Sequence, residues 1–337
     1  MSRLLFTLLA IGSLVPLAGA GEPSIFIGGS QGGINGDIEF RDGRALVARY
    51  HVASDIAKPY LWPMYAPGDI PVTRAWPLEK GAPKETKDHV HQKSAWFCHG
   101  DIVPEGIELK AKIKGVEGVD FWSEAAGHGR ILFTPFGTGE FPTVSMKPTI
   151  ATHNVWLTAE GVKILDEDRN ITLKLVGENR LLIFDIDLHA SECPITFADT
   201  KEGAFGVRVN DEIRLDSKGP KSKMVNADGK SGEKDIWGYR SDWCDYSGEI
   251  GGKLAGIAVF DDPKNPYRAC WHARAYGLMA ANPFGREHSG FPAMKGQTDL
   301  VKLKKGEHLK LRYGIYLHAG DVETGKVADA FKVFCAK

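Results

Sequence analysis

The densest group of side chains able to do chemistry in this sequence of 337 residues lies between Asp88 and Asp101, where three histidines stand among acidic residues. His89 and His91 are two positions apart, so on an extended chain both imidazoles point to the same side and can face one metal ion or one substrate. Asp101 can add an oxygen ligand, and His99 can add a further group for proton transfer near neutral pH. The segment predicts either a catalytic site that includes His89, His91 and His99 or a divalent-metal site formed by His89, His91 and Asp101.

The same segment also has a purely structural interpretation. Its polar residues can belong to an edge strand and a loop, while Trp96 and Phe97 contact the core and the imidazoles bond to the backbone. Cys98 and His99 are neighbours, and neighbours on a strand point to opposite faces. We therefore do not expect a cysteine nucleophile there.

A second group follows Asp199, where a polar turn leads into a strand. Ala204, Gly206 and Arg208 share one face of that strand, so small residues precede a guanidinium that can bind a carboxylate or sugar hydroxyls. Glu202 is the carboxylate best placed for general base catalysis in such a cleft. The alternative is an exposed Arg–Glu pair, which contributes little to stability.

A third group lies between Trp271 and Pro292. His272, Arg274 and Tyr276 alternate onto one face, and aromatic rings interleaved with polar groups suit a sugar or another amphipathic ligand. His288 lies in a loop rich in glycine and proline, a usual place for functional groups. Core packing accounts for the large aromatic residues of this segment but less easily for its histidines and arginine.

The elements that must position these residues are mostly strands. Apolar residues alternate with polar ones from Ile171 to Leu188 around a Gly-Glu-Asn turn, which predicts a hairpin. From Leu309 to Leu317 one face is apolar, and we expect the face that carries Lys310 and His318 to line solvent or a cleft. Further short strands are predicted at residues 45–52, 107–113, 130–136, 204–209 and 256–260.

Only the spacing of Val327, Ala330, Phe331 and Phe334 indicates a helix, at the end of the chain. The 39 glycines and 18 prolines are scattered between the strands as turn residues. This pattern predicts an all-β fold, a large antiparallel β-sandwich that can extend to a supersandwich, with a short C-terminal helix.

The ends and the composition indicate an exported protein. Residues 1–20 read as a signal peptide, with a basic Arg3, an apolar run and a small-x-small cleavage pattern, so that residues 21–337 form a single domain outside the cytoplasm, secreted or periplasmic. No other stretch is apolar enough to cross a membrane. The 42 basic and 43 acidic residues balance, which argues against a nucleic-acid partner and favours a small molecule or an oligosaccharide. Five cysteines without a CxxC pair allow up to two disulfides.

Several motifs that would name a reaction are missing from the sequence. It contains no P-loop, no dinucleotide-binding G-x-G-x-x-G between a strand and a helix, and no HExxH. The residues allow a divalent metal ion and specify no other cofactor.

The sequence resembles a family of secreted bacterial proteins that carry the label methane oxygenase PmoA-like. The resemblance rests on Asp88 to Asp101, Thr200 to Arg208, Trp271 to Gly285 and Gly314 to Asp321, and so spans most of the chain after residue 20. Membership implies a β-sandwich. In that family a third histidine often follows the His-x-His pair, whereas this chain has Gln92, so residue 92 is a poor metal ligand.

A weaker resemblance, in architecture and residue types, is to galactose mutarotase-like sandwiches, which hold sugars in a concave face with histidines and a glutamate. Together these observations predict a secreted carbohydrate-active enzyme of hydrolase or lyase type. Its acid–base groups would be Glu202 and the histidines at 89, 91, 99 and 272, and its substrate contacts Arg208, Arg274, Tyr276 and His288. Two alternatives remain open: a non-catalytic carbohydrate-binding protein, and a metal-dependent oxygenase with His89, His91 and a carboxylate as ligands.

Overall fold

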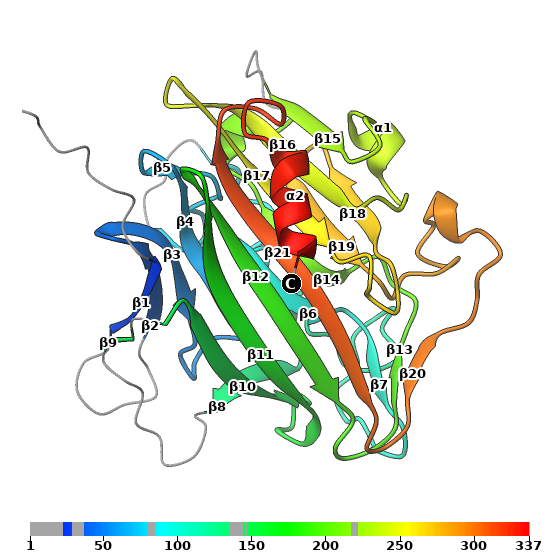
Figure 1. Cartoon of the computed structure of the whole chain (residues 1–337). Helices are drawn as coiled ribbons and strands as arrows, with labels where there is room; N and C mark the ends of the chain where they lie inside the picture. Colours follow the sequence, from blue (N-terminus) through cyan, green and yellow to red (C-terminus); the bar gives the residue numbers. More distant parts are fainter. Residues whose placement is uncertain are drawn as a thin grey trace, which may run out of the picture.

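A computed structural model describes residues 23–28, 37–79, 85–134, 144–145, 147–216 and 222–336. Within these ranges the longest sheet has ten strands in the order β18-β19-β14-β6-β4-β3-β2-β1-β9, with β5 paired to β4 (Figure 1). Its strands are β1 (Pro23–Gly28), β2 (Asp37–Asp42), β3 (Ala45–His51), β4 (Tyr60–Ala66), β5 (Ile70–Pro71), β6 (Ala95–His99), β9 (Val144–Ser145), β14 (Gly203–Arg208), β18 (Cys270–Arg274) and β19 (Leu278–Asn282).

A second sheet has eight strands in the order β15-β16-β17-β21-β12-β11-β10-β8, and a small third sheet has the order β20-β13-β7. The strands of the second sheet are β8 (Arg130–Thr134), β10 (Thr149–Leu157), β11 (Lys163–Val176), β12 (Asn179–His189), β15 (Lys223–Asn226), β16 (Trp243–Ile250), β17 (Lys253–Asp261) and β21 (His308–Ala319). The strands of the third sheet are β7 (Ile102–Pro104), β13 (Ile195–Phe197) and β20 (Val301–Leu303). The helical elements are η1 (Asp211–Ile213), α1 (Glu233–Ile236), η2 (Pro292–Met294) and α2 (Val327–Cys335).

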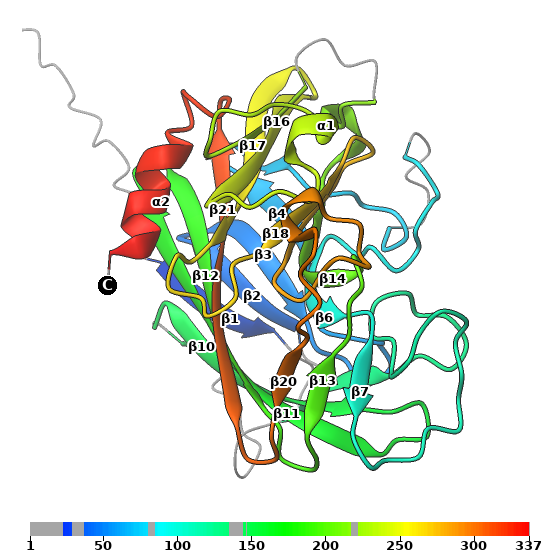
Figure 2. The same cartoon turned by 90° about the vertical axis from the view of Figure 1, so that its right-hand side faces the viewer.

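The two large sheets pack face to face, and aromatic rings fill the space between them. Phe205 of β14 lies 4.9 Å from Phe184 of β12 and 4.9 Å from Tyr313 of β21, measured between ring centroids. Phe97 of β6 contacts Trp156 of β10 in the same layer. Rings of this size bury large apolar areas, so this layer is the main core (Figure 2). The predicted all-β antiparallel sandwich is confirmed.

The predicted hairpin is formed by β11 and β12, which pair from Asp166↔His189 to Val176↔Asn179. The predicted C-terminal helix is α2, which lies on the outer side of the second sheet (Figures 1 and 2). It packs on Leu181, Phe260 and Tyr316. The outer face of β21 is therefore covered at its C-terminal end, and Tyr316 and His318 are buried there instead of lining solvent.

Some expectations do not hold or fall outside the described residues. Residues 107–113 form no strand, because the backbone there leaves the sheet as an irregular segment. The predicted signal peptide lies in the part of the chain that is not described. All five cysteines are unpaired, and in the described residues no helix is long and apolar enough to cross a membrane.

Candidate functional site

One row of buried residues crosses the outer face of the first sheet, on the side away from the second sheet. In register, His272 of β18 lies beside Ala280, Ala280 beside Gly206 of β14, Gly206 beside Trp96 of β6, and Trp96 beside Tyr60. The two small residues leave room between His272 and the indole of Trp96. A Cβ on Gly206 would lie 2.8 Å from that ring, so the glycine is needed for the close approach.

Glu202 stands at the start of β14 on this same face. Its backbone oxygen accepts a 2.7 Å hydrogen bond from the amide of Gly100, and a Cβ on Gly100 would meet the Cβ atoms of both Glu202 and Trp122. Trp122 in turn packs on Trp96 with ring centroids 5.1 Å apart. Glu202 is thereby placed beside the tryptophan pair.

The side chain of Glu202 is partly buried, and its carboxyl group accepts no hydrogen bond from any described residue. Burial raises the pKa of this carboxyl group, and the nearby charge of Asp120 adds to the effect, against the opposing charges of Lys201 and Arg274. Five other acids around the site are engaged with donors: Asp88, Asp101, Asp120, Glu124 and Asp199. Glu117 is exposed and, like Glu202, accepts no hydrogen bond from a described residue. Glu202 is therefore an acid with a perturbed pKa that is not held by a structural partner.

His272 is buried and neutral. Burial lowers its pKa to about 3, with the charge of Arg274 acting in the same direction and a hydrogen bond to the Lys201 backbone opposing it. A backbone carbonyl only accepts, so the nitrogen that faces Lys201 carries the proton. Nδ1 of His272 has no partner among the described residues and keeps its lone pair.

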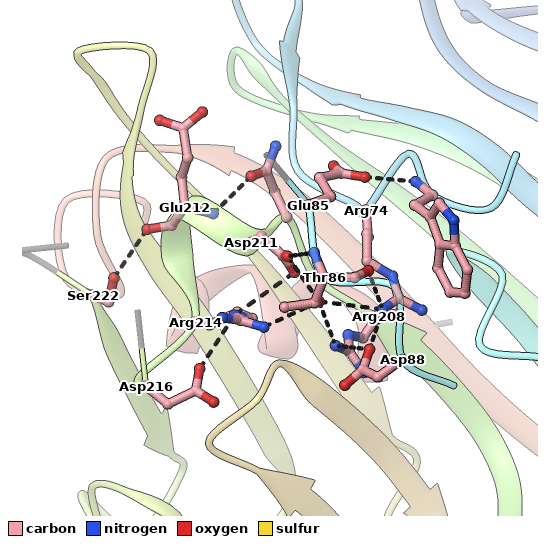
Figure 3. A network of polar contacts seen from close by, with 12 residues as sticks. Arg74, Glu85, Thr86, Asp88, Arg208, Asp211, Glu212, Arg214, Asp216 and Ser222 are labelled. Carbon is pink, nitrogen blue, oxygen red and sulfur yellow. Dashed lines mark hydrogen bonds and ion pairs between the residues drawn. The ribbon is translucent and has the colours of Figure 1, made fainter. Parts of the chain in front are cut away.

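The loop that carries His89 is anchored by Asp88 (Figure 3). Arg74 and Arg208, both fully buried, donate to the same oxygen, Oδ1 of Asp88, at 2.5 and 2.8 Å. Burial raises the pKa of this carboxyl group, but the charge of Arg208 and hydrogen bonds from His89, Arg74 and Arg208 outweigh it and hold the pKa well below its usual range. Asp88 is an anion that ties the loop to β14.

Asp88 also orients His89, since its second oxygen lies 3.1 Å from Nδ1 of that imidazole. A carboxylate bound to Nδ1–H fixes the tautomer and leaves Nε2 as an acceptor. The His89 ring is 40% exposed and is stacked on Tyr276, with ring centroids 4.9 Å apart and planes 8° from parallel. His89 thus presents a fixed imidazole at the surface of the site.

His91 reaches the same place, although not by strand alternation. Residues 88–91 are not extended, because His89 has a φ of 44° and the chain turns after it. The two imidazoles nevertheless lie 5.7 Å apart, and His91 is 6.3 Å from Trp122. Burial lowers the pKa of His91 to about 4, and the charges of Lys58 and His89 add to this, so His91 is neutral at pH 7.

Left-handed backbone conformations gather around this cluster. In the described chain five residues other than glycine have positive φ, and three of them are His89, Ser94 at 57° and Glu124 at 54°. Such conformations are costly for residues with a Cβ and concentrate at functional sites.

Arg208 differs from the prediction that it binds substrate. Its guanidinium is fully buried, donates to Gln92 Oε1 at 2.7 Å and to Asp88, and lies 4.7 Å from the centre of the Tyr276 ring. All of this contact is with the protein itself. Arg208 is a positioning residue, because it holds the loop and the tyrosine in place.

His99 and Asp101 are also placed differently from the prediction. His99 lies on the inner face of the sheet, where Nε2 bonds to the Ala198 carbonyl at 2.8 Å and the ring packs on Phe284. The oxygens of Asp101 accept from the backbone amides of Glu117 and Gly118 at 2.9 and 2.6 Å.

The predicted metal site is consequently not assembled. Within the described ranges no three histidine, cysteine or acidic side chains come together in a way that would hold a metal ion. His89 and His91 are neighbours, but the side chain of Asp101 contacts a different loop, at Glu117 and Gly118.

A cavity of about 590 Å³ adjoins Glu202. Its wall includes Glu202, Lys201 and His288, and the ring of His288 is exposed there. Asp199 fixes this wall by accepting the amides of Arg286 at 2.6 Å and of His288 at 2.5 Å. The predicted His288 therefore meets Glu202 at the cavity, whereas the cavity wall does not include His89.

Arg274 keeps an accessible position. Its side chain is 35% exposed, its Nε lies 3.1 Å from Glu233, and its guanidinium is 6.0 Å from the centre of the Tyr276 ring. Its charge acts on the pKa values of both Glu202 and His272. Arg274 and Tyr276 remain candidates for contact with substrate.

Sequence reasoning missed the supports of this site. Lys58 is buried and donates to the Trp122 carbonyl at 3.1 Å and to Glu124 at 2.8 Å, and Lys93 donates to the other oxygen of Glu124 at 2.6 Å. Arg74, the second arginine on Asp88, was also missed. In the sequence these supports are visible only as charged residues next to apolar ones, and that pattern does not specify which acid each of them would contact.

Comparison with known proteins places the chain in a family. Residues 37–332 match the model of a family described as "Family of unknown function (DUF6807)". The chain belongs to this family. The family model covers most of the chain, and neither a PmoA-like label nor a galactose mutarotase-like relative is shown. No curated protein matches the sequence.

Among solved structures, the chain is similar to a GH36 alpha-galactosidase from Geobacillus stearothermophilus. A substituted form of that enzyme in complex with raffinose aligns with a TM-score of 0.37 and 11% identity, and the enzyme without these substitutions with 0.37 and 12%. Each alignment covers 84% of this chain and 41% of the other, so the chain spans less than half of the length of these structures.

Proposed function

We propose that this family member is a secreted carbohydrate-active enzyme of hydrolase or lyase type, with its site on the outer face of the first sheet around Glu202. The observation that carries the proposal is the state of that carboxyl group. It is partly buried at the edge of a cavity and has a raised pKa, yet no described side chain donates to it, while Asp101, Asp120 and Asp199 nearby are all bonded. A carboxyl group in this state is suited to general acid catalysis near neutral pH.

The groups around Glu202 suit a sugar. The exposed ring of His89 and the partly exposed ring of His91 offer flat faces for the apolar side of a pyranose, and Arg274, Lys201 and His288 offer polar contacts for hydroxyl or carboxylate groups. The indole nitrogen of Trp122 is a buried donor without a partner in the described residues. A ligand that accepts this hydrogen bond would remove the cost of leaving it unsatisfied.

The test uses oligosaccharides of neutral sugars and of uronic acids, with products detected by mass spectrometry. Glu202→Gln keeps the shape of the side chain and removes its proton transfer, so we expect turnover to fall by ~100-fold or more. The matched control is Glu108→Gln, because Glu108 is exposed and its side chain has no partner among the described residues.

Three outcomes decide the proposal. Loss of turnover in Glu202→Gln alone supports it. Equal turnover in both variants removes Glu202 from the mechanism. Saturable binding in calorimetry without any product from the wild-type protein would instead establish a non-catalytic carbohydrate-binding protein.

A further inference from the structure

Two glutamates of the cavity wall, Glu202 and Glu117, accept no hydrogen bond from a described residue, and they lie in different surroundings. Most glycoside hydrolases need two carboxyl groups that flank the scissile bond, one as acid and one as base or nucleophile. Glu202 lies on the sheet face that carries Arg274, whereas Glu117 is exposed on the segment between β7 and β8. Asp120, the acid whose charge acts on Glu202, accepts the amides of Trp122 at 2.6 Å and Ser123 at 3.1 Å, and it is buried. Hydrolysis with Glu117 as the second carboxylate is therefore the competing reaction, and the oxygen-18 experiment below distinguishes it from elimination.

A base of another kind is present. Asp88 holds Nδ1 of His89 at 3.1 Å, which leaves Nε2 as an exposed acceptor, and stacking on Tyr276 fixes the plane of the ring. This arrangement of a carboxylate and an imidazole is the one that prepares histidine to take up a proton. The loop conformation that produces it includes the left-handed backbone of His89.

A cation lies near the tyrosine that supports the base, and its charge acts on the acid. Arg274 is partly exposed and is 6.0 Å from the Tyr276 ring on which His89 stacks, and its charge acts on Glu202. Its ion pair with Glu233 uses Nε, at 3.1 Å, so the terminal nitrogens remain for a ligand carboxylate.

We infer that the enzyme is a lyase for oligosaccharides that contain a uronic acid, with His89 as base, Arg274 as the partner of the substrate carboxylate and Glu202 as acid. This inference rests on the proposed function and specifies its reaction and substrate class. Arg274 neutralises the carboxylate at C5, which makes the C5 proton more acidic. His89 Nε2 takes that proton, the electron pair of the C5–H bond forms the C4=C5 double bond, and the C4–O bond breaks.

The leaving oxygen receives its proton from Glu202. The step consumes no water and needs no oxidant or reductant, and solvent exchange returns the proton from His89 to Glu202. The position of Glu202 also fits cleavage within a chain, because the cavity of about 590 Å³ lies beside it and can hold the next sugar.

The experiment measures how the bond is broken. Wild-type protein is incubated with oligogalacturonate, oligomannuronate and a glucuronate-containing oligosaccharide in water enriched in oxygen-18, and products are read by mass and by the ultraviolet absorbance of the conjugated double bond. Elimination gives an unsaturated product without the label. A labelled, saturated product would show hydrolysis and overturn the inference while the proposed function stands.

The role of Arg274 is tested with a pair of substrates. Methyl esterification removes the charge of the uronate, so Arg274→Met should lower kcat/KM at least 10-fold more for the free acid than for the ester, and Arg274→Lys should restore part of the loss. Arg240→Met, which changes another exposed arginine, should affect both substrates equally little. Equal losses on acid and ester in Arg274→Met would overturn the role of Arg274.

The role of His89 is tested by substitution. His89→Gln should abolish elimination, while binding of the uncleaved oligosaccharide to this variant persists in calorimetry; elimination at the wild-type rate in His89→Gln would overturn the role of His89 as base. Turnover of neutral oligosaccharides alone would overturn the lyase assignment, and no turnover of either class would overturn the proposed function itself.

Discussion

Asp88 is the acid on which the geometry of the site depends, and replacing it should have a large effect. In Asp88→Asn the guanidinium groups of Arg74 and Arg208, both 0% exposed, would remain close together without the carboxylate that now accepts from both at 2.5 and 2.8 Å. Removing one partner of a buried ion pair costs about 3–5 kcal/mol, because the remaining charge is left without compensation.

The loss of stability that we expect for Asp88→Asn is smaller than that range. Its side chain is 38% exposed, so water reaches the site and screens part of the repulsion between the arginines. We therefore expect a loss of about 2–3 kcal/mol in the free energy of unfolding. With an m-value of a few kcal/mol per molar in urea, the midpoint of denaturation should fall by roughly 1 M.

The assay is urea denaturation followed by tryptophan fluorescence, with Asp228→Asn as control because Asp228 is exposed and outside this network. Adding Arg74→Met to Asp88→Asn should recover part of the loss, since one of the two repelling charges is then gone.

The pH dependence of the free energy of unfolding has a definite sign. The depressed pKa of Asp88 gives stability that is present above its unfolded pKa of about 3.9 and is lost as the pH falls below it. Equal midpoints for Asp88→Asn and Asp228→Asn would refute the reasoning.

Three further predictions concern packing, protonation and thiols. Gly206→Ala puts a Cβ 2.8 Å from the Trp96 ring and should cost about 1–3 kcal/mol in urea denaturation; an unchanged midpoint would mean that the indole moves aside without cost. Burial lowers the pKa of three histidines, to about 4, about 4 and about 3 in the order His91, His99 and His272. Because the fold prefers their neutral forms, stability should be full above the unfolded pKa of about 6.5 and fall between pH 6.5 and 5; a flat series of urea midpoints there would contradict this. Alkylation of the native protein should modify Cys335 first, as it is the one cysteine that is not buried, and a faster reaction at any of the other four, read by peptide mass spectrometry, would contradict the packing.

The sequence predicted the fold well because its signals are local. Alternation along β11, β12 and β21 depends on which face of each strand is buried, and the spacing from Val327 to Phe334 repeats every helical turn. Residues 107–113 show the limit of that reasoning. They alternate in polarity, yet they form no strand, since alternation says nothing about whether a neighbouring strand is available for pairing.

The site was predicted in part. The sequence located Glu202, His89, His91, His272, Arg274, Tyr276 and His288, but it could not separate them from His99, which shares their segment and faces the core. It also interpreted Arg208 as a substrate contact. Its actual partners, Gln92 and Asp88, are 116 and 120 residues away in the chain, and such pairings depend on the register of β14 and β6.

The shared oxygen of Asp88 has a consequence for how this family can vary. Arg74 and Arg208 come from distant parts of the chain and share one charged acceptor atom, so keeping both arginines costs stability when the acid is lost, and the acid has little reason to stay when both arginines are gone. Positions 74, 88 and 208 should therefore change together among relatives. Members that have exchanged all three for neutral residues would need another way to orient the imidazole at position 89. Comparing the reactions of such members with that of this protein would show whether the activity depends on the Arg74–Asp88–Arg208 ion pairs or on the histidine alone.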